Sequence, residues 1–535
     1  MSTRSSLPIG RLGGPHPVVR GRRMHDLLVA AASLVVPLAL GLAITLSSPR
    51  PNALLILGLM IGVAFVVVLL VSRRYEVTLM LLALYLGLLD GPIKLEAASK
   101  ASSGVRDVLI IAIALGMIMR LVVRKGRIRL PPLSAWIVAF VAFVLIEALN
   151  PKTHGILKVV GGWRQLLEWV PFFYFGYLVV RSKQRFRQLF MLLGVIALLN
   201  GVVGAVQTHI SPGSLASWGP GYSGLVHGGQ EGTGLTGRTF KSNGVTHARP
   251  PALGSDSGFG GGVGVLALPG LLALLAAGKV RRRWLVVLLA LGAVLGIATA
   301  ASRTSVVSAV VVLLSFGGLS LLAGIRVGRA FTVVVVIVAL AFGVVTVLTG
   351  IEGSGIFARQ ETLTSSSELQ EHGAGAKERS LGQIPSDVVR APLGVGLGTA
   401  GSVGGFGGAQ KVELEGEKVI GGSAYSLLWK ESGAPGLLIW LGLTLNVILL
   451  GAARLRKVKD VELRTYLLGA IVAFIALTIQ GLSGPTLAVT IGAFLWFVPG
   501  VISYWLAGDG REEAFGTAPE RPHAPGLMPA AAGAL

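Results

Sequence analysis

The chain has 535 residues, of which 53% are hydrophobic and 13% are charged, and its mean hydropathy is +0.74. A soluble domain carries roughly 25% charged residues, so this composition excludes a water-soluble fold. The net charge of +22 does not indicate a nucleic-acid-binding protein, because the Lys and Arg residues stand in short clusters between apolar blocks. Cysteine is absent, which excludes disulfides, thiolate metal ligands and cysteine nucleophiles.

The apolar blocks have the length that is needed to cross a hydrocarbon core of about 30 Å, and they predict about fourteen transmembrane helices. In chain order these are 27–46, 53–71, 77–89, 108–123, 133–149, 166–180, 189–206, 258–278, 284–301, 306–322, 331–348, 435–451, 466–482 and 487–506. The first is too long for the apolar core of a signal peptide, so we expect a retained helix. The third is short and ends at Asp90. The eighth is rich in glycine, which predicts close helix packing.

The basic residues predict the orientation, because Lys and Arg are retained on the cytoplasmic side of a membrane. With the N-terminus inside, the inner segments hold 28 of the 47 basic residues and the outer segments hold 18. We therefore expect a multi-pass protein of the cytoplasmic membrane with both termini inside. The predicted parts are a tail (1–26), helices 1–7 (27–206), an outer loop (207–257), helices 8–11 (258–348), a large outer loop between helices 11 and 12 (349–425), helices 12–14 (426–507) and a disordered tail (508–535).

Four stretches at the predicted outer face carry residues suited to chemistry. The first, from Arg249 to Gly260, closes the first long loop and includes Asp256, for which the predicted role is a helix cap. The second, Thr299–Ser305, joins two helices with almost no loop. The third pairs Lys377–Arg379 with the glycine-rich run Pro392–Gly398, and a helix is expected between them near 380–389. The fourth, Ser423–Gly436, leads into the next helix.

Taken in this order, the four stretches resemble the O-antigen ligase and O-antigen polymerase superfamily of bacterial envelope glycan enzymes. The resemblance covers roughly residues 160–500. It implies an all-α fold of the GT-C type and transfer of a saccharide from an undecaprenyl diphosphate carrier to an acceptor sugar at the outer membrane face. It also implies a lipid-linked glycan donor, an acceptor glycan or lipid and membrane lipids as partners, with no nucleic acid, no cofactor and no metal.

The resemblance suggests Arg303 and Arg249 as the catalytic pair, since a planar guanidinium binds phosphate oxygens bidentately and can stabilise a leaving diphosphate. The structural alternative for Arg303 is an interfacial anchor, and the alternative for Arg379 is an ion pair with Glu378. The residues expected to contact substrate are Ser302, Arg379, Gly394, Gly396, Tyr425 and Glu431.

The sequence departs from the family pattern at one position. Where ligases of the family carry His-Asn, this chain has Gly422 and Ser423, so the expected general base is missing. His247 is a possible substitute, although a solvated loop histidine is the simpler interpretation. Two other functions stay open: a flippase or other transporter for lipid-linked oligosaccharides, and a membrane scaffold. A transporter should show repeat symmetry, interrupted helices and ionisable residues at the membrane midplane.

Overall fold

The computed structural model describes residues 75–97, 100–123, 130–153, 155–227, 239–242, 245–325, 381–400, 413–414, 417–418, 423–484 and 486–516, with isolated positions between 328 and 343. The chain divides into two compact units. The first comprises Met1–Thr78 and Val105–Arg127, and the second comprises Leu79–Gly104 and Ile128–Leu535. In the first unit the described residues are helical and belong to α3 (Tyr75–Leu84) and α5 (Lys100–Val123).

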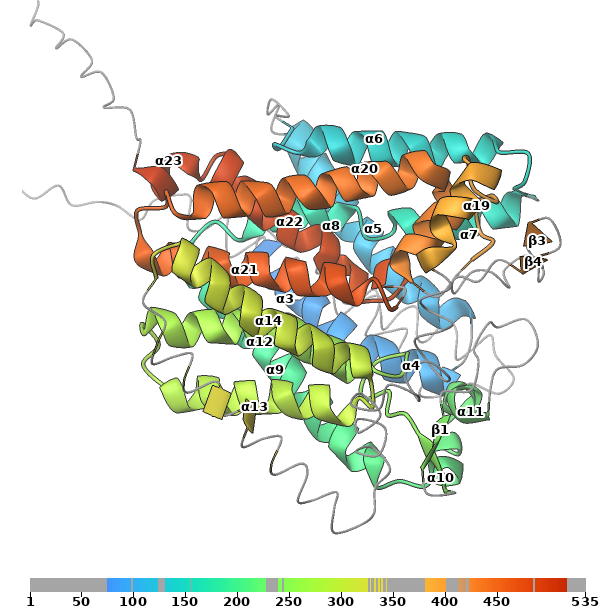
Figure 1. Ribbon diagram of the computed structural model, residues 1–535, viewed down its shortest axis with the longest axis horizontal. Coiled ribbons are helices and arrows are strands. Elements are labelled where there is room, and N and C mark those ends of the chain that lie inside the picture. The colour runs from blue at the N-terminus through green and yellow to red at the C-terminus, as the bar shows by residue number, and fades with distance from the viewer. Residues whose placement is uncertain are drawn as a thin grey trace, which may run out of the picture. The chain divides into compact units, whose positions relative to one another are not determined.

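The second unit is built almost entirely from helices (Figure 1). Its first half contains η1 (Tyr85–Leu89), α4 (Asp90–Ala97), α6 (Ser134–Ile146), η2 (Glu147–Leu149), α7 (Ile156–Leu167), α8 (Pro171–Val179), α9 (Lys183–Thr208), α10 (Pro212–Ala216) and α11 (Pro220–His227). Its second half contains α12 (Phe259–Ala277), α13 (Arg283–Thr299), α14 (Arg303–Leu322), α19 (Ile384–Arg390), α20 (Ala424–Leu455), α21 (Val461–Gln480), η5 (Thr486–Ala488), α22 (Gly492–Ala507) and α23 (Arg511–Phe515). Two antiparallel hairpins pair β1 (Thr239–Ser242) with β2 (Val245–Ala248) and β3 (Glu413–Leu414) with β4 (Glu417–Lys418).

Six helical stretches within the described residues are long and apolar enough to cross a membrane. They are Glu76–Glu96, Lys183–Thr208, Phe259–Ala277, Arg303–Leu322, Ala424–Leu455 and Val461–Gln480. Shorter apolar helices lie at Ser134–Leu149, Arg283–Thr299 and Gly492–Ala507. The predicted helical class is therefore confirmed, and the length and composition of these helices suit a membrane protein. The count of fourteen stays a prediction, because the spans 27–46, 53–71 and most of 331–348 lie outside the described residues.

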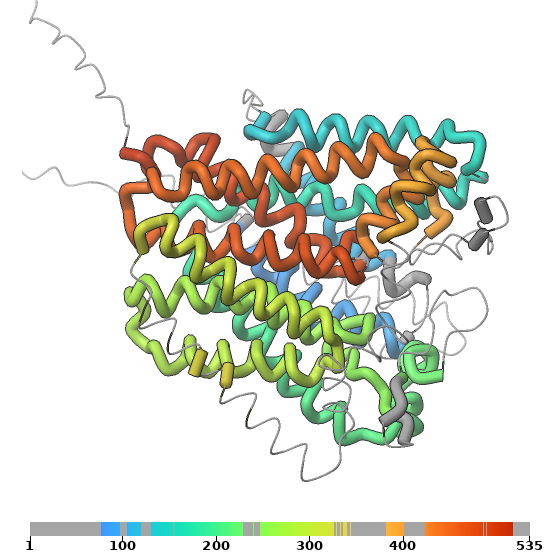
Figure 2. Tube along the Cα trace, viewed as in Figure 1, coloured from blue at the N-terminus to red at the C-terminus, as the bar shows by residue number. Residues whose placement is uncertain are grey.

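The core of the second unit is α12, which packs against α9, α13, α14 and α21. Its glycines explain this position. A Cβ atom built on Gly264 would lie 2.4 Å from the carbonyl oxygen of Ala293 in α13, so only glycine permits this approach of the two helices. The predicted close packing at this span is confirmed. On the other side of α21, α20 runs beside α6 although the two are far apart in sequence (Figure 2).

The third predicted span was expected to end at Asp90, and this boundary is wrong. The helix continues as α4 to Ala97 after a π-helical turn at Tyr85–Leu89. Pro92 lies in the first turn of α4 within this continuous helix, and it has no N–H to donate to the preceding turn. The next boundary also shifts: Pro171 begins α8, so the predicted span 166–180 starts with a turn.

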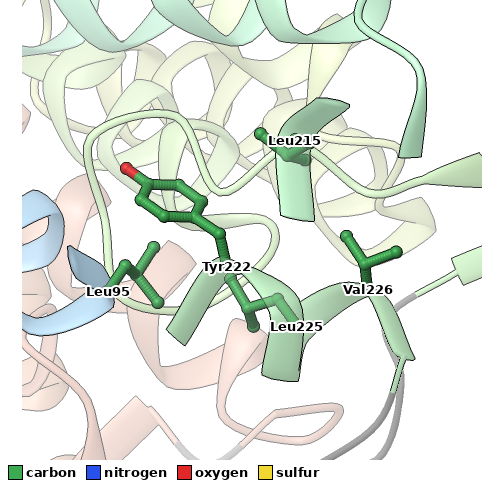
Figure 3. Close-up of a cluster of buried hydrophobic side chains, with 5 residues drawn as sticks. All are labelled: Leu95, Leu215, Tyr222, Leu225 and Val226. Atoms are coloured by element: carbon green, nitrogen blue, oxygen red, sulfur yellow. The ribbon is translucent and has the colours of Figure 1, made fainter. Parts of the chain in front are cut away.

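The first long loop contains its own folded elements. Its two short helices, α10 and α11, form a hydrophobic cluster with α4 made by Leu95, Leu215, Tyr222, Leu225 and Val226 (Figure 3). The hairpin β1–β2 joins this packing through Ala248. The described elements of the 207–257 segment thus pack together with α4, and β2 leads directly into the stretch that begins at Arg249.

Candidate functional site

The helices of the second unit have two sets of ends that differ in composition. One set carries several basic side chains that bond to acids or to backbone carbonyls. Lys183 at the start of α9 forms an ion pair with Asp460 at 2.7 Å, and Arg187 bonds to Glu462. The Arg464 guanidinium donates to the carbonyl oxygen of Ala323 after α14, at 2.9 Å. We call this the basic end. Because helices alternate in direction, the described residues of the four stretches singled out in the sequence fall at the other end, called here the site end.

The first stretch is positioned by two buried amide side chains of α9. Gln207 binds both backbone groups of Ala252: its Oε1 accepts from the N–H at 2.8 Å and its Nε2 donates to the carbonyl at 3.1 Å. Two turns earlier, Asn200 Oδ1 accepts from the N–H of Leu253 at 3.1 Å and Nδ2 donates to the carbonyl of Gly87. The backbone that follows Arg249 is therefore fixed against α9 and η1.

The start of α12 lies against the start of α14. Gly258, with φ of 89°, is the N-cap residue of α12, so the proposed cap at Asp256 is wrong in its position. The Gly258 N–H donates to the carbonyl of Pro250 at 3.3 Å. A Cβ atom built on Gly258 would lie 3.8 Å from the Cβ of Ser302, the N-cap residue of α14. The segments that carry Arg249 and Arg303 are thus adjacent.

Arg303 is the first residue of α14 and follows a tight connection in which Ala301 adopts a φ of 47°. The next residue, Thr304, accepts a hydrogen bond from the Ser483 hydroxyl at 2.7 Å. Ser483 belongs to the turn after α21, which also receives α20: the Ala424 N–H donates to the carbonyls of Gly481 at 2.8 Å and of Gly484 at 3.0 Å. This turn joins the second stretch to the fourth.

Helix α20 is broken at Gly433, whose φ of 61° and ψ of −169° are not helical. The break frees backbone groups on both sides. The third stretch bonds to them: the Val395 N–H donates to the carbonyl of Lys430, and the Ala434 N–H donates to the carbonyl of Pro392, both at 2.8 Å. Residues 392–400, called here the closing segment, therefore complete the hydrogen bonding of α20 at its break.

Glu431 lies beside the break and is fully buried. Its Oε1 accepts from the Ala400 N–H at 3.0 Å and from Gln165 Nε2 at 3.1 Å. Gln165 Nε2 also lies 3.1 Å from the carbonyl of Ala400, so the three groups form one compact network. Among the described residues, Oε2 of Glu431 has no hydrogen-bond partner.

Two buried lysines accompany this carboxylate. Lys158 on α7 is 2% exposed and Lys430 on α20 is 5% exposed. Burial lowers the pKa of Lys158, because an ammonium loses its hydration there, and the negative charge of Glu431 opposes this effect. An acid and two cations thus share the interior of the site end.

The predicted substrate-contact residues fall into three groups. Ser302 lies at the site end, while Arg379 is outside the described residues. Gly394 and Gly396 have positive φ and pack directly on backbone: a Cβ atom on Gly396 would lie 2.8 Å from the carbonyl carbon of Lys152. Tyr425 and Glu431 are buried inside α20, which begins earlier than the predicted span 435–451. Their contact with substrate stays a prediction, as does that of the glycines.

Sequence reasoning missed several polar residues at this end. Asn200, Gln207 and Gln165 stand in or beside apolar runs, and such isolated amides in a membrane helix are a signal of a buried partner. Asp90 was read only as a helix end. It is buried, pairs with Lys94 at 2.7 Å and accepts from the Thr490 hydroxyl at 3.3 Å.

The alternative base, His247, lies in β2 opposite Phe240, and this hairpin packs on α10 and α11. Within the described residues, no group of three His, Asp or Glu side chains could hold a metal ion. Comparison with known proteins finds no matching family model, no matching curated protein and no matching solved structure. The chemistry of the site end therefore has to be argued from its residues.

Proposed function

We propose that this protein transfers a saccharide from an undecaprenyl diphosphate-linked donor to an acceptor sugar at the outer face of the cytoplasmic membrane, as a relative of the glycan ligases and polymerases. The supporting observation is that the described parts of the four stretches are linked to one another. A Cβ atom on Gly258 would lie 3.8 Å from the Cβ of Ser302, Thr304 bonds to Ser483, and the turn that contains Ser483 bonds to the start of α20. The closing segment then bonds to the break in α20.

Electrostatics at this end suit a lipid diphosphate. Helices α12, α14 and α20 all begin here, and each N-terminus carries partial positive charge. Arg249 and Arg303 come from the two adjacent segments and add full charges. In this proposal they bind the diphosphate as it leaves the sugar, and an acceptor hydroxyl attacks the anomeric carbon. Its proton passes to a base that we leave unassigned.

The test compares Arg303→Ala, Arg303→Lys and Arg281→Ala in cells that lack the chromosomal copy. Arg303→Ala should lower transfer by about 10²–10³-fold, since one donor of a preorganised electrostatic site is lost. Arg303→Lys should restore little, because a point charge does not bind phosphate bidentately. Arg281 is exposed in the loop after α12 and serves as a matched control. Normal transferred glycan with Arg303→Ala would contradict the proposal.

A transporter remains the second candidate, because α20 is interrupted and has buried charges beside the break. In transporters such breaks face a substrate cavity. Here the freed groups are bonded to Pro392 and Val395 instead, which favours the transferase. Movement of a fluorescent lipid-linked saccharide across proteoliposomes, unchanged by Arg303→Ala, would favour the transporter.

A further inference from the structure

We propose that Glu431 is a positioning residue that fixes the closing segment, residues 392–400, to α7 and α20 and thereby sets the position of the α20 start beside Arg303. Its effect on transfer rests on the proposed function, whereas its effect on the closing segment does not. Glu431 is suited to this role because a fully buried carboxylate is costly unless hydrogen bonds compensate for its lost hydration. Its bonds go to the closing segment and to α7, at Ala400 and Gln165.

The closing segment touches α7 and the turn before it so tightly that it has one position. The Leu397 N–H donates to the Thr153 hydroxyl at 3.0 Å. A Cβ atom on Gly398 would lie 2.4 Å from the carbonyl oxygen of Lys158, and one on Gly162 would lie 2.8 Å from the Gly398 nitrogen. Glu431 is the residue of α20 whose side chain reaches across this contact.

The same carboxylate is linked to the arginine site through short, regular structure. From Glu431 the helix runs back two turns to Ala424, whose N–H bonds to Gly481 and Gly484. Tyr425 adds a hydrogen bond from its hydroxyl to the carbonyl of Thr478 at 3.1 Å. The turn after α21, which receives Ala424, bonds through Ser483 to Thr304 next to Arg303. Displacement of the closing segment would therefore displace this turn.

The chain has no cysteine, so a single introduced thiol can report on the closing segment in native membranes. Thr399 is 8% exposed and Leu393 is 56% exposed. In otherwise unaltered protein, Thr399→Cys should react slowly with a charged maleimide and Leu393→Cys should react fast. Adding Glu431→Ala should raise the rate at Thr399→Cys by about tenfold or more, because the Ala400 N–H of the segment loses its charged acceptor and Gln165 loses the carboxylate that holds it. The rate at Leu393→Cys should stay within about twofold.

Glu431→Gln is the conservative variant. It keeps an oxygen for Ala400 and Gln165, so labelling at Thr399→Cys should return most of the way to the slow rate, and transfer should recover relative to Glu431→Ala. If Glu431→Ala does not reach the membrane, Glu431→Leu provides the same test, because it fills the buried space but cannot accept from Ala400 or Gln165. Slow labelling at Thr399→Cys in Glu431→Ala, or in Glu431→Leu where that is used, would overturn the role of Glu431 in the closing segment. If Glu431→Ala speeds labelling at Thr399→Cys but leaves glycan transfer undiminished, Glu431 fixes the closing segment but does not act on the site at Arg303.

Discussion

The hydroxyl of Ser483 donates to the hydroxyl of Thr304 at 2.7 Å, joining residues that are 179 positions apart. This bond links the turn after α21 to the first turn of α14. It is the direct side-chain contact between the Arg303 stretch and the segment that receives α20.

We expect Ser483→Ala to lower the free energy of unfolding by about 1 kcal/mol, the usual net value of one such bond. Thr304→Val should cost a similar amount, and the double variant should cost less than the sum, because both changes remove one interaction. The midpoint of the helical circular dichroism signal in a fixed detergent measures this. Strict additivity would show that the two hydroxyls do not interact.

Gly396 and Gly155 provide a matched pair for the packing of the closing segment. Both have positive φ, 97° and 87°, but an added Cβ atom meets the Lys152 backbone at Gly396 and nothing within 4 Å at Gly155. Gly155→Ala should cost about 1–3 kcal/mol from backbone strain alone. Gly396→Ala should cost about 1–3 kcal/mol more, since overpacking adds to the strain. Equal thermal midpoints for the two variants would contradict the described contact.

At the basic end, Asp460 combines an ion pair with a helix cap. Its Oδ1 accepts from the Leu463 N–H at 3.0 Å, and its other oxygen bonds to Lys183. Burial raises the pKa of Asp460, but the bonds to Lys183 and to Leu463 together outweigh this effect and hold its pKa below the ordinary value of 3.8.

Asp460→Ala should therefore lose about 1 kcal/mol of stability with the cap, whereas Asp460→Asn keeps a capping oxygen and should lose less. A carboxyl with a depressed folded pKa stabilises the fold above its unfolded pKa, about 3.9, and this contribution disappears as the pH falls through the folded value. The gap in thermal midpoint between the parent and Asp460→Asn should thus close on acidification below about pH 4. A gap that is constant with pH would exclude the ion pair as its cause.

The orientation in the membrane is predicted from charge and can be tested with reporter fusions. Fusions at Lys183 and Lys457, in loops of the basic end, should report the cytoplasm. Fusions at Gly234 and Gly404, in the two long loops but outside the described residues, should report the outer side. If Gly234 and Gly404 fall on opposite sides, the number of spans between them is wrong by an odd number, and the proposed site is lost with it.

The sequence predicts the helices of this protein well where apolar runs are uninterrupted, because membrane-spanning length and hydropathy alone determine them. It fails at α20. Lys430, Glu431 and Ser432 interrupt the apolar pattern, so the predicted span begins at 435 rather than at Ala424. These polar residues are compatible with a helix only because Ala400, Gln165 and the closing segment supply partners. Such partners come from distant parts of the chain, which periodicity does not reveal.

For the candidate site, too, the sequence predicted local features but not the contacts between distant parts of the chain. Local motifs singled out Ser302, Arg303 and the glycine-rich run, and these residues lie at the same end of the unit. They did not show that Gly394 and Gly396 are required by backbone contacts, nor that Asn200 and Gln207 fix the stretch after Arg249. Those roles depend on which backbone groups a buried amide or glycine meets, and only the packed helices determine that.

The break at Gly433 has a consequence for how this protein can be taken apart. Pro392 and Val395 supply hydrogen bonds that α20 lacks at its break. The part of the large loop around these two residues therefore contributes to the stability of the helix. A chimera that exchanges this loop with a junction just before Ala424 would leave two backbone groups of α20 unpaired in an apolar surrounding. A junction placed ahead of α19 would carry the missing partners with the helix. The junction for exchanging the loop therefore lies about forty residues before Ala424, the first residue of α20.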